Sequence, residues 1–452
     1  MFRTATTTSL GSLPRARPAA IGRTGLRLSR DPFRAILFVI TVLTVSRVHQ
    51  HFPLLAKARP VLVLYMLTAA FIVLAPRSVS MTTLFRTWPP KVVAALGVVA
   101  CISALFGISF GGAASFLVSV YSSVLVYAFL LFIGIRNARE LYTFVWAFLV
   151  GVALLVWQAL AVFHLLPVPG QSIARLAEMY TYDSNDLGCV LIVGLVLAVL
   201  TLLVAGKKGK VTSAMLLVGI GVALARSGSR GAFVGLIGTG CALLLLLKRV
   251  SLMKRVGFVA IVGGGLAVAA PPGYWEQIGT VLSPTKDYNW QSGDGRREIW
   301  ARGIGYMLDY PAFGIGINNF ERAEGTISDK ARRSFAGDPI RWVAPHNSFV
   351  QVGAELGLPG LILWSSLIVG GIVGMSRLRR RLPPACAHGD AEERLLYLAT
   401  FHLPLALIGF AITASFVSFA YLDLVYMLAA FVAGVYVAAS EKARRTAATQ
   451  VR

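Results

Sequence analysis

The chain has 452 residues, of which 56% are hydrophobic and only 14% are charged, and its formal net charge is +23 at pH 7. A soluble globular domain rarely combines so few charges with so much apolar surface. The excess of Lys and Arg does not indicate a nucleic-acid-binding protein, because these residues lie in short loops between apolar runs, as the positive-inside rule describes for membrane proteins.

The chain starts with a basic segment, residues 1–32, that is rich in Arg, Thr, Ser and Pro. We interpret it as a cytoplasmic tail, and a second basic tail is expected at residues 440–452. A secretory signal peptide is an alternative for the first segment, with residues 33–45 as the apolar core and 56–58 as the cleavage site. The basic lead-in is too long to favour that alternative.

Apolar runs of about the length that a membrane-crossing helix needs recur along the chain. They predict an all-α polytopic membrane protein with about twelve transmembrane helices, the first nine within residues 33–270 and the last three within residues 357–439. The expected spans are 33–48, 60–75, 92–110, 116–135, 141–166, 187–205, 211–225, 231–247, 256–270, 357–375, 395–415 and 417–439.

Basic residues in alternate loops indicate that both termini are cytoplasmic. One hairpin departs from this assignment, because Arg47, Lys57 and Arg59 then fall on the outer side. Residues 271–356 form the largest outer loop and contain the only long polar stretch. Within it we expect a helix at residues 298–308, a glycine-rich turn at 314–320 and a short helix from His346 to Glu355.

Polar residues gather at the outer membrane surface in four places. Arg226 and Arg230 occupy a tight outer turn where the positive-inside rule disfavours them. A guanidinium binds phosphate with two parallel hydrogen bonds, so this turn fits a diphosphate headgroup, although snorkelling to lipid phosphates is the alternative. The other three places are residues 180–187, with Asn185 and Asp186; residues 293–298, with Arg296 and Arg297; and residues 345–347, with His346 and Asn347.

Each of these side chains also has an ordinary structural explanation. Arg296 and Arg297 can pair with Asp294 or Glu298 rather than bind an anion. His346 is either an acid–base group or one of the many histidines without a catalytic role. Glu355 can cap its helix, pair with an arginine or bind sugar hydroxyls, and it falls on the opposite helix face from His346.

The sequence lacks the patterns of metal- and nucleotide-dependent transferases. It has no Asp-x-Asp pair, no phosphate-cradling nucleotide loop and no zinc-ligand spacing, and Cys101, Cys189, Cys241 and Cys386 suggest neither a metal cluster nor a disulfide pair. We therefore predict group transfer without a metal or cofactor, from a donor that need not be a nucleotide.

The ordered motifs from the sixth to the tenth expected span resemble the O-antigen ligase and polymerase family of bacterial envelope glycosyltransferases. The matching pieces are Tyr182-Asp183-Ser184-Asn185-Asp186-Leu187, Gly228-Ser229-Arg230-Gly231-Ala232, Arg297-Glu298-Ile299-Trp300, the run from Tyr310 to Gly316, and Pro345-His346-Asn347-Ser348-Phe349 with Glu355-Leu356-Gly357. The first five expected spans are similar only in being membrane helices.

The resemblance implies a fold similar to the GT-C class, with a large periplasmic loop in the bacterial inner membrane. It implies transfer of a glycan from undecaprenyl diphosphate to an acceptor hydroxyl. The acceptor is a lipid A core in a ligase, a growing glycan in a polymerase or a protein in a protein glycosyl ligase, and the sequence does not separate these three. Arg230 and Arg297 would hold the diphosphate and His346 would activate the acceptor. Paired arginines, Arg226 with Arg230 and Arg296 with Arg297, leave open which member of each pair acts.

A lipid-glycan transporter and a non-catalytic assembly partner are alternatives from other classes. Transport needs charged residues along a path through the bilayer. Within the expected spans such polar residues are few, namely Gln158, His402 and Asp423. Polar residues gather instead at one face, which favours chemistry at the membrane surface.

Overall fold

A computed structural model describes residues 26, 28, 31–74, 81–167, 174–176, 182–246, 251–282, 295–329, 331 and 342–450. Within these residues, 8 helical segments are long and apolar enough to cross a membrane. The chain is thus a multi-pass helical membrane protein, as its sequence predicts. The segments are α4 (Trp88–Phe106), α5 (Phe110–Phe116) continued by η4 (Leu117–Tyr121) and α6 (Ser122–Gly134), α7 (Ala138–Trp157) with η5 (Gln158–Val162), α8 (Ser184–Val204), α9 (Lys207–Ser227), α17 (Ser348–Arg381), α18 (Ala391–Ala414) and α19 (Asp423–Gln450).

Shorter helices complete the bundle. Four of them are apolar: α1 (Pro32–Ser46), α3 (Pro60–Leu74), α10 (Arg230–Leu246) and α11 (Leu252–Ala269). The others lie at the ends of the long helices: η1 (Val48–His51), α2 (Pro53–Lys57), η3 (Met81–Arg86), α12 (Tyr274–Gly279), η6 (Thr280–Leu282), α14 (Arg296–Asp309), α15 (Phe320–Thr326) and η9 (Pro384–His388). The observed α14 agrees with the loop helix expected at residues 298–308.

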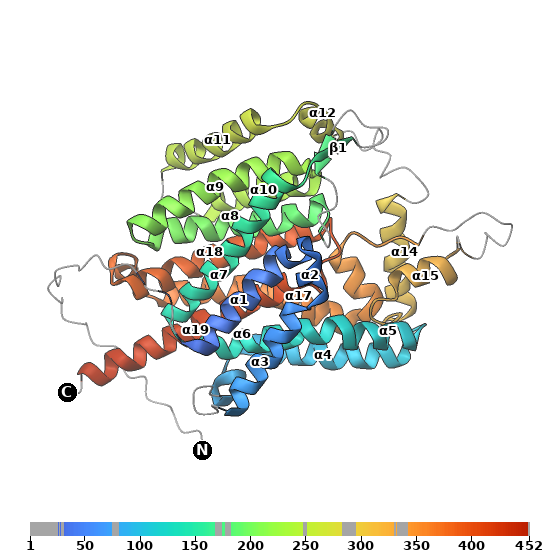
Figure 1. Ribbon diagram of the computed structural model, residues 1–452, viewed down its shortest axis with the longest axis horizontal. Coiled ribbons are helices and arrows are strands. Elements are labelled where there is room, and N and C mark those ends of the chain that lie inside the picture. Colours follow the sequence, from blue (N-terminus) through green and yellow to red (C-terminus); the bar gives the residue numbers. More distant parts are fainter. Residues whose placement is uncertain are drawn as a thin grey trace, which may run out of the picture.

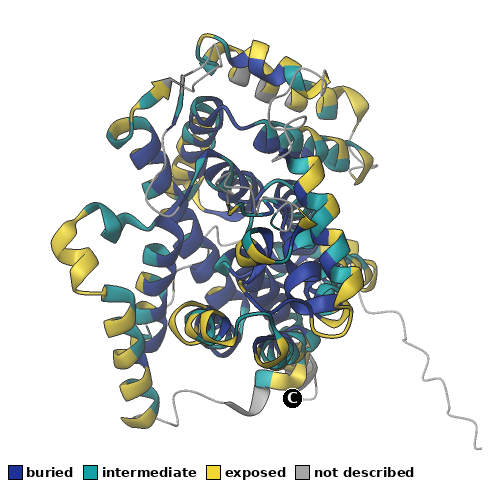
Figure 2. Ribbon diagram, turned by 90° about the vertical axis from the view of Figure 1, so that its right-hand side faces the viewer, coloured by how far each residue is buried: buried dark blue, intermediate teal, exposed yellow. Residues whose placement is uncertain are grey.

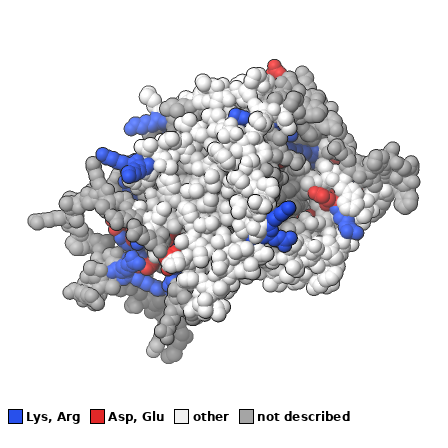
Figure 3. All heavy atoms as spheres, in the orientation of Figure 1, with Lys and Arg blue, Asp and Glu red and all other residues white. Residues whose placement is uncertain are grey.

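The long helices run in broadly the same direction, with α14 and α15 at one end of the bundle and the C-terminal part of α19 at the other (Figure 1). Buried residues fill the middle of the bundle and exposed residues lie on its outer helices (Figure 2). On the face shown in Figure 3, charged side chains of both signs lie mainly towards each end of the molecule, and the surface between the two ends is largely uncharged. This distribution is typical of a protein surrounded by lipid.

Helix α8 forms the centre of one half of the bundle, where it packs against α7, α9, α10 and α18. Small residues allow these helices to approach closely. A Cβ atom on Gly188 would lie 2.4 Å from the Ala232 Cβ of α10, and one on Gly235 would lie 2.3 Å from Thr413 Cγ2 of α18. Close approach at small residues stabilises helix pairs in membranes through van der Waals contact.

The fifth expected span is too long, and the fold is not entirely helical. Its helix ends at Val162, and the chain continues into β1 (Leu165–Pro167), which pairs antiparallel with β2 (Ala174–Leu176). The hydrophobicity of residues 163–166 predicts a longer span, because short apolar runs do not distinguish a strand from a helix.

Helix α17 consists of two helices joined at a sharp break, which lies at the boundary expected between the short loop helix and the tenth span. Gly357 interrupts it with a φ of 68°, a left-handed conformation that favours glycine. A Cβ there would also lie 2.6 Å from the Pro311 carbonyl oxygen. The first part begins at Ser348, so His346 lies before the helix and does not open it.

The last two expected spans are separated by a loop of residues 415–422, where the sequence suggested a single intervening residue. The apolar residues Phe416, Val417 and Phe419 made this loop look like part of a span. Its backbone instead turns between α18 and α19, and the loop forms hydrogen bonds with His346 and Ser348 at the start of α17. The sequence prediction was wrong here because hydropathy does not report backbone conformation.

Internal bonds account for the polar residues of the expected spans. Arg47, just after α1, forms a 2.9 Å ion pair with Asp423 at the start of α19. This ion pair explains the basic residue that the charge pattern assigns to the outer side. Gln158 Nε2 donates to the Ser46 carbonyl oxygen at 2.9 Å, and the His402 ring nitrogen Nδ1 lies 2.8 Å from the Leu398 carbonyl oxygen. Each of these three polar side chains therefore has a partner within the protein.

Candidate active site

The start of α8 is built by the first polar motif. Asp183 is the N-cap residue, and its side chain accepts the backbone N–H groups of Asn185 and Asp186 at 2.7 and 2.8 Å. The Asp186 carboxylate accepts the Asp183 N–H at 3.1 Å, which completes a capping box. Asp186 is therefore used locally to begin the helix, whereas the Asn185 side chain remains available to a neighbouring element.

The two arginines of the turn between α9 and α10 contact different segments of the chain. Gly228 ends α9 in a left-handed conformation with a φ of 57°. The Arg226 guanidinium donates to the carbonyl oxygens of Leu160 and Phe163, both at 3.4 Å, and so binds the end of η5. Arg230 instead donates to Thr280 Oγ1 at 2.8 Å, beside α12.

A hydrogen bond joins this turn to the start of α8. Ser229 Oγ donates to Asn185 Oδ1 at 2.7 Å, and it also accepts the Ala232 N–H at 3.1 Å. Ser229 and Asn185 are both at least half-buried. Two motifs that are 44 residues apart in sequence therefore form one surface at this end of the bundle.

The third motif lies at the start of α14. Arg296 is half-buried and Arg297 is exposed; of their two expected partners, Glu298 is exposed and Asp294 lies outside the described residues. One turn further along, Trp300 Nε1 donates to the Pro345 carbonyl oxygen at 2.9 Å. This bond brings the beginning of α14 next to the residue before His346.

His346 is held in a strained backbone conformation by the loop between α18 and α19. Its φ is 44°, which is uncommon for a residue with a side chain. The His346 N–H donates to Ser418 Oγ at 3.1 Å. Ser348 Oγ donates to the Val417 carbonyl oxygen and accepts the Phe419 N–H, both at 2.8 Å. Such strain persists only where surrounding contacts enforce it, and it is common at functional sites.

The charges of Arg296 and Asp183 both affect the pKa of His346. Burial and the positive charge of Arg296 lower the pKa of His346 below its usual range, and the negative charge of Asp183 opposes this shift. A histidine with a lowered pKa is neutral at physiological pH and can accept a proton. The electrostatics therefore connect the first, third and fourth motifs.

Asn347 and Glu355 have clear structural uses. Asn347 caps α17, because its Oδ1 atom accepts the N–H groups of Phe349 and Val350 at 3.0 and 3.2 Å. Glu355 is only 1% exposed, and its carboxylate accepts the N–H groups of Asn318 and Phe320, both at 3.0 Å. Glu355 thus holds the glycine-rich turn against α17.

The predicted residues divide into two groups. Asn185, Arg230, Arg296 and His346 belong to segments that the hydrogen bonds and electrostatic interactions above relate at one end of the bundle, and this group combines cationic side chains with an imidazole. Arg226, Asp186, Asn347 and Glu355 bind the protein's own backbone, and Arg297 is exposed. Among the described residues, no group of three His, Cys, Asp or Glu side chains is arranged to hold a metal ion.

Four residues of the site were not selected from the sequence. Asp183 and Ser229 lie inside the recognised motifs, so their position next to selected residues was the available signal. Thr280 and Ser418 contact Arg230 and His346 from segments 50 and 72 residues away. No local pattern marks them, because only tertiary packing brings them to the site.

The chain's similarity to known proteins covers this region. Residues 214–365 match the family described as O-antigen ligase. The match extends from α9 to the first turns after the Gly357 break, and so includes Arg226, Arg230, Arg296, Arg297, His346 and Glu355. No curated protein matches the chain.

Proposed function

We propose that the chain transfers a glycan from undecaprenyl diphosphate to an acceptor hydroxyl without a metal, in keeping with the O-antigen ligase family that residues 214–365 match. The observation that carries this proposal is the joining of the arginine turn, the start of α14 and the segment of His346 at one end of the membrane bundle. This end combines fixed positive charge with a neutral base.

Arg230 and Arg296 are the arginines that we assign to the donor diphosphate. Two N–H groups of Arg226 already donate to backbone carbonyls, which favours Arg230 as the acting member of the first pair. The charge of Arg296 acts on His346, which favours Arg296 over the exposed Arg297 in the second pair. Fixed guanidinium groups stabilise negative charge that develops on a leaving group.

The proposed reaction is a single displacement at the anomeric carbon. The acceptor hydroxyl oxygen forms the new bond to that carbon while the bond from the carbon to the diphosphate oxygen breaks. The electron pair leaves with undecaprenyl diphosphate, and the hydroxyl proton moves to His346. Attack opposite to the leaving group inverts the anomeric configuration, so a product of retained configuration would contradict this mechanism.

The site would face the periplasm, with both termini in the cytoplasm of a bacterial inner membrane. The eight long helical segments together with α1, α3, α10 and α11 would make twelve crossings in a GT-C-like arrangement. Basic loops between the long helices at the end that carries both termini support this orientation. Internal bonds of Asp423, Gln158 and His402 argue against a transporter.

The test is turnover of an undecaprenyl-diphosphate oligosaccharide by the purified protein without divalent metal. We expect release of undecaprenyl diphosphate by the wild type, and a loss of about 10²–10⁴ in rate for His346→Ala. Release that is the same in Arg230→Ala and His346→Ala as in the wild type would exclude this site. Lipid A core added as acceptor indicates a ligase, while transfer only to another glycan repeat indicates a polymerase.

A further inference from the structure

A cavity of about 750 Å³ lies at the end of the bundle opposite to the candidate active site. It is enclosed by the first turns of α1, α4 and α7, by η3 and by the C-terminal part of α19. Its volume is within the range of small-molecule sites. The charged lining residues are Arg34, Arg86, Arg136, Glu140, Glu441 and Arg444.

The two acidic residues of this lining, Glu140 and Glu441, each form an ion pair with an arginine. Glu140 forms a 2.7 Å ion pair with Arg34, which is buried, and it also accepts the Arg136 N–H at 2.7 Å. Glu441 contacts a guanidinium outside the lining, that of Arg445, at 2.6 Å. The negative charge in the cavity is therefore already compensated.

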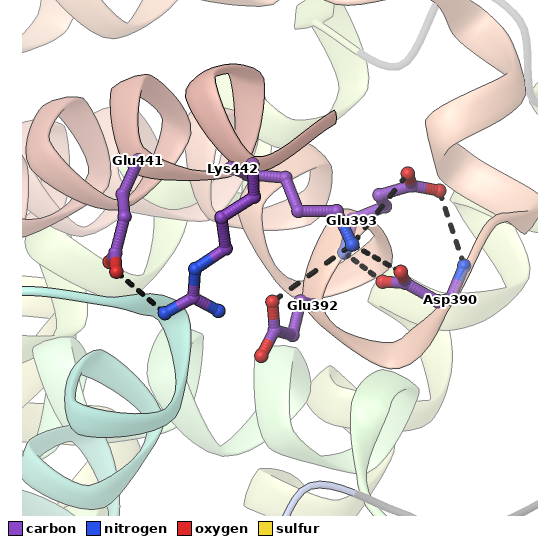
Figure 4. Close-up of polar contacts among 6 residues, drawn as sticks. Asp390, Glu392, Glu393, Glu441 and Lys442 are labelled. Carbon is purple, nitrogen blue, oxygen red and sulfur yellow. Dashed lines mark hydrogen bonds and ion pairs between the residues drawn. The ribbon is translucent and has the colours of Figure 1, made fainter. Parts of the chain in front are cut away.

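Figure 4 shows how the nearby acidic residues are used. Lys442 contacts Asp390 and lies 3.9 and 4.0 Å from carboxylate oxygens of Glu393 and Glu392. These contacts bind the end of α19 to the start of α18, and they leave those three acids committed to Lys442 rather than to the cavity.

Three cations of the lining remain. Among the described residues, Arg86, Arg136 and Arg444 form no ion pair with a carboxylate. They come from η3, the loop before α7 and the end of α19, so three separate elements direct positive charge to one cavity. Trp88, Tyr436 and Val437 supply an apolar side to the same space.

We propose that this cavity binds the phosphate of an anionic phospholipid headgroup. Arginine clusters bind phosphate through paired hydrogen bonds, and basic pockets between transmembrane helices on the cytoplasmic side bind such headgroups. The apolar side and the position at the end of the bundle favour a lipid over a soluble phosphate compound, because acyl chains can continue along the helices. This proposal is independent of the glycan-transfer reaction.

The probe is dihexanoyl phosphatidylglycerol, a short-chain anionic lipid, in equilibrium binding to the full-length protein in a nonionic detergent. We expect binding at least about 10-fold tighter than that of zwitterionic dihexanoyl phosphatidylcholine. The variant Arg86→Ala/Arg136→Ala/Arg444→Ala should lose about 100-fold in affinity, since each basic residue near an anionic headgroup contributes about 5-fold.

Two further triple variants control this experiment. Lys207→Ala/Lys208→Ala/Lys210→Ala removes the same charge from the first turn of α9, outside the cavity, and it should change affinity by less than about 2-fold. Arg86→Lys/Arg136→Lys/Arg444→Lys keeps the charge and should retain most of the binding, which separates loss of the site from loss of the fold.

Three results would overturn the proposal. Unchanged lipid binding by the triple alanine variant would mean that the cavity is not the site. An equal loss in the triple variant of Lys207, Lys208 and Lys210 would indicate general attraction to a basic surface. Displacement of the lipid by an equal concentration of glycerol 3-phosphate would identify a site for soluble phosphate compounds.

Discussion

Ser229 Oγ donates a 2.7 Å hydrogen bond to Asn185 Oδ1 and so joins the turn that carries Arg230 to the start of α8. The bond sets where the arginine turn lies relative to Asp183, whose charge acts on His346. It therefore connects the part of the site that we assign to the diphosphate with the part that we assign to the acceptor.

Loss of this hydrogen bond should lower kcat/KM clearly while lowering the stability of the fold only slightly. We expect Asn185→Ala and Ser229→Ala each to lower the free energy of unfolding by about 1 kcal/mol and to lower kcat/KM about 10-fold by displacing Arg230. The double variant should be no worse than the poorer single variant, because both remove one bond. Additive losses in release of undecaprenyl diphosphate would mean that the two residues act separately.

The two arginines of the α9–α10 turn should respond differently to substitution. Arg230→Ala should lower kcat about 10²–10³-fold, the usual cost of removing one stabilising donor from a transition state. Arg226→Ala should mainly reduce the melting temperature, because its guanidinium binds the carbonyl oxygens of Leu160 and Phe163. Steady-state kinetics and thermal unfolding of both variants check this difference. If Arg226→Ala lowered kcat and Arg230→Ala mainly lowered the melting temperature, Arg226 would be the arginine that binds the diphosphate.

Transfer should depend on pH through His346. Because burial and Arg296 lower its pKa, the neutral base is present at neutral pH, and kcat should fall only as the pH drops through that lowered pKa. Arg296→Gln removes a positive charge, so it should raise the pKa and move the acid limb to higher pH. The exposed neighbour provides the control, since Arg297→Gln should leave the limb in place. A pH profile that is the same for all three proteins would rule out His346 as the base.

Glu355 should prove structural. In Glu355→Gln one carboxylate oxygen that accepts a backbone N–H is replaced by an amide group that donates, so we expect a loss of about 2 kcal/mol in the free energy of unfolding. Glu321→Gln, a change to an exposed acid of α15, should alter it by less than about 0.5 kcal/mol. Denaturation in detergent checks both. A variant of normal stability with a raised KM would instead support binding of sugar hydroxyls.

The ion pair between Arg47 and Asp423 should be required for stability. Arg47→Ala leaves the Asp423 carboxylate, whose side chain is 13% exposed, without its partner, and the loss should approach the roughly 3–5 kcal/mol that is typical of a fully buried pair. Arg47→Met/Asp423→Leu removes both charges and should recover most of that loss, because it leaves no unpaired buried charge. Thermal unfolding of the single and double variants measures the effect. Equal losses in the two would mean that the pair contributes net attraction beyond its desolvation cost.

Several features of the molecule follow directly from local sequence. Apolar run length predicts the membrane helices, since a helix must satisfy its own backbone inside lipid. The helix at residues 298–308 is readable because its apolar residues recur at helical spacing and Asp309-Tyr310-Pro311 follows it. The motifs that contain Arg230, Arg296 and His346 are likewise contiguous, so the sequence alone indicates the family and the region of the site.

Tertiary structure alone decides what each of those residues contacts. Arg226 and Arg230 are equivalent by type and by location in the sequence, and they differ only because Leu160, Phe163 and Thr280 approach the turn from distant segments. The loop of residues 415–422 reads as membrane helix, yet it holds His346 through Ser418. Hydropathy and motifs describe each segment separately, whereas hydrogen-bond partners and charge environments depend on which segments the folded chain brings together.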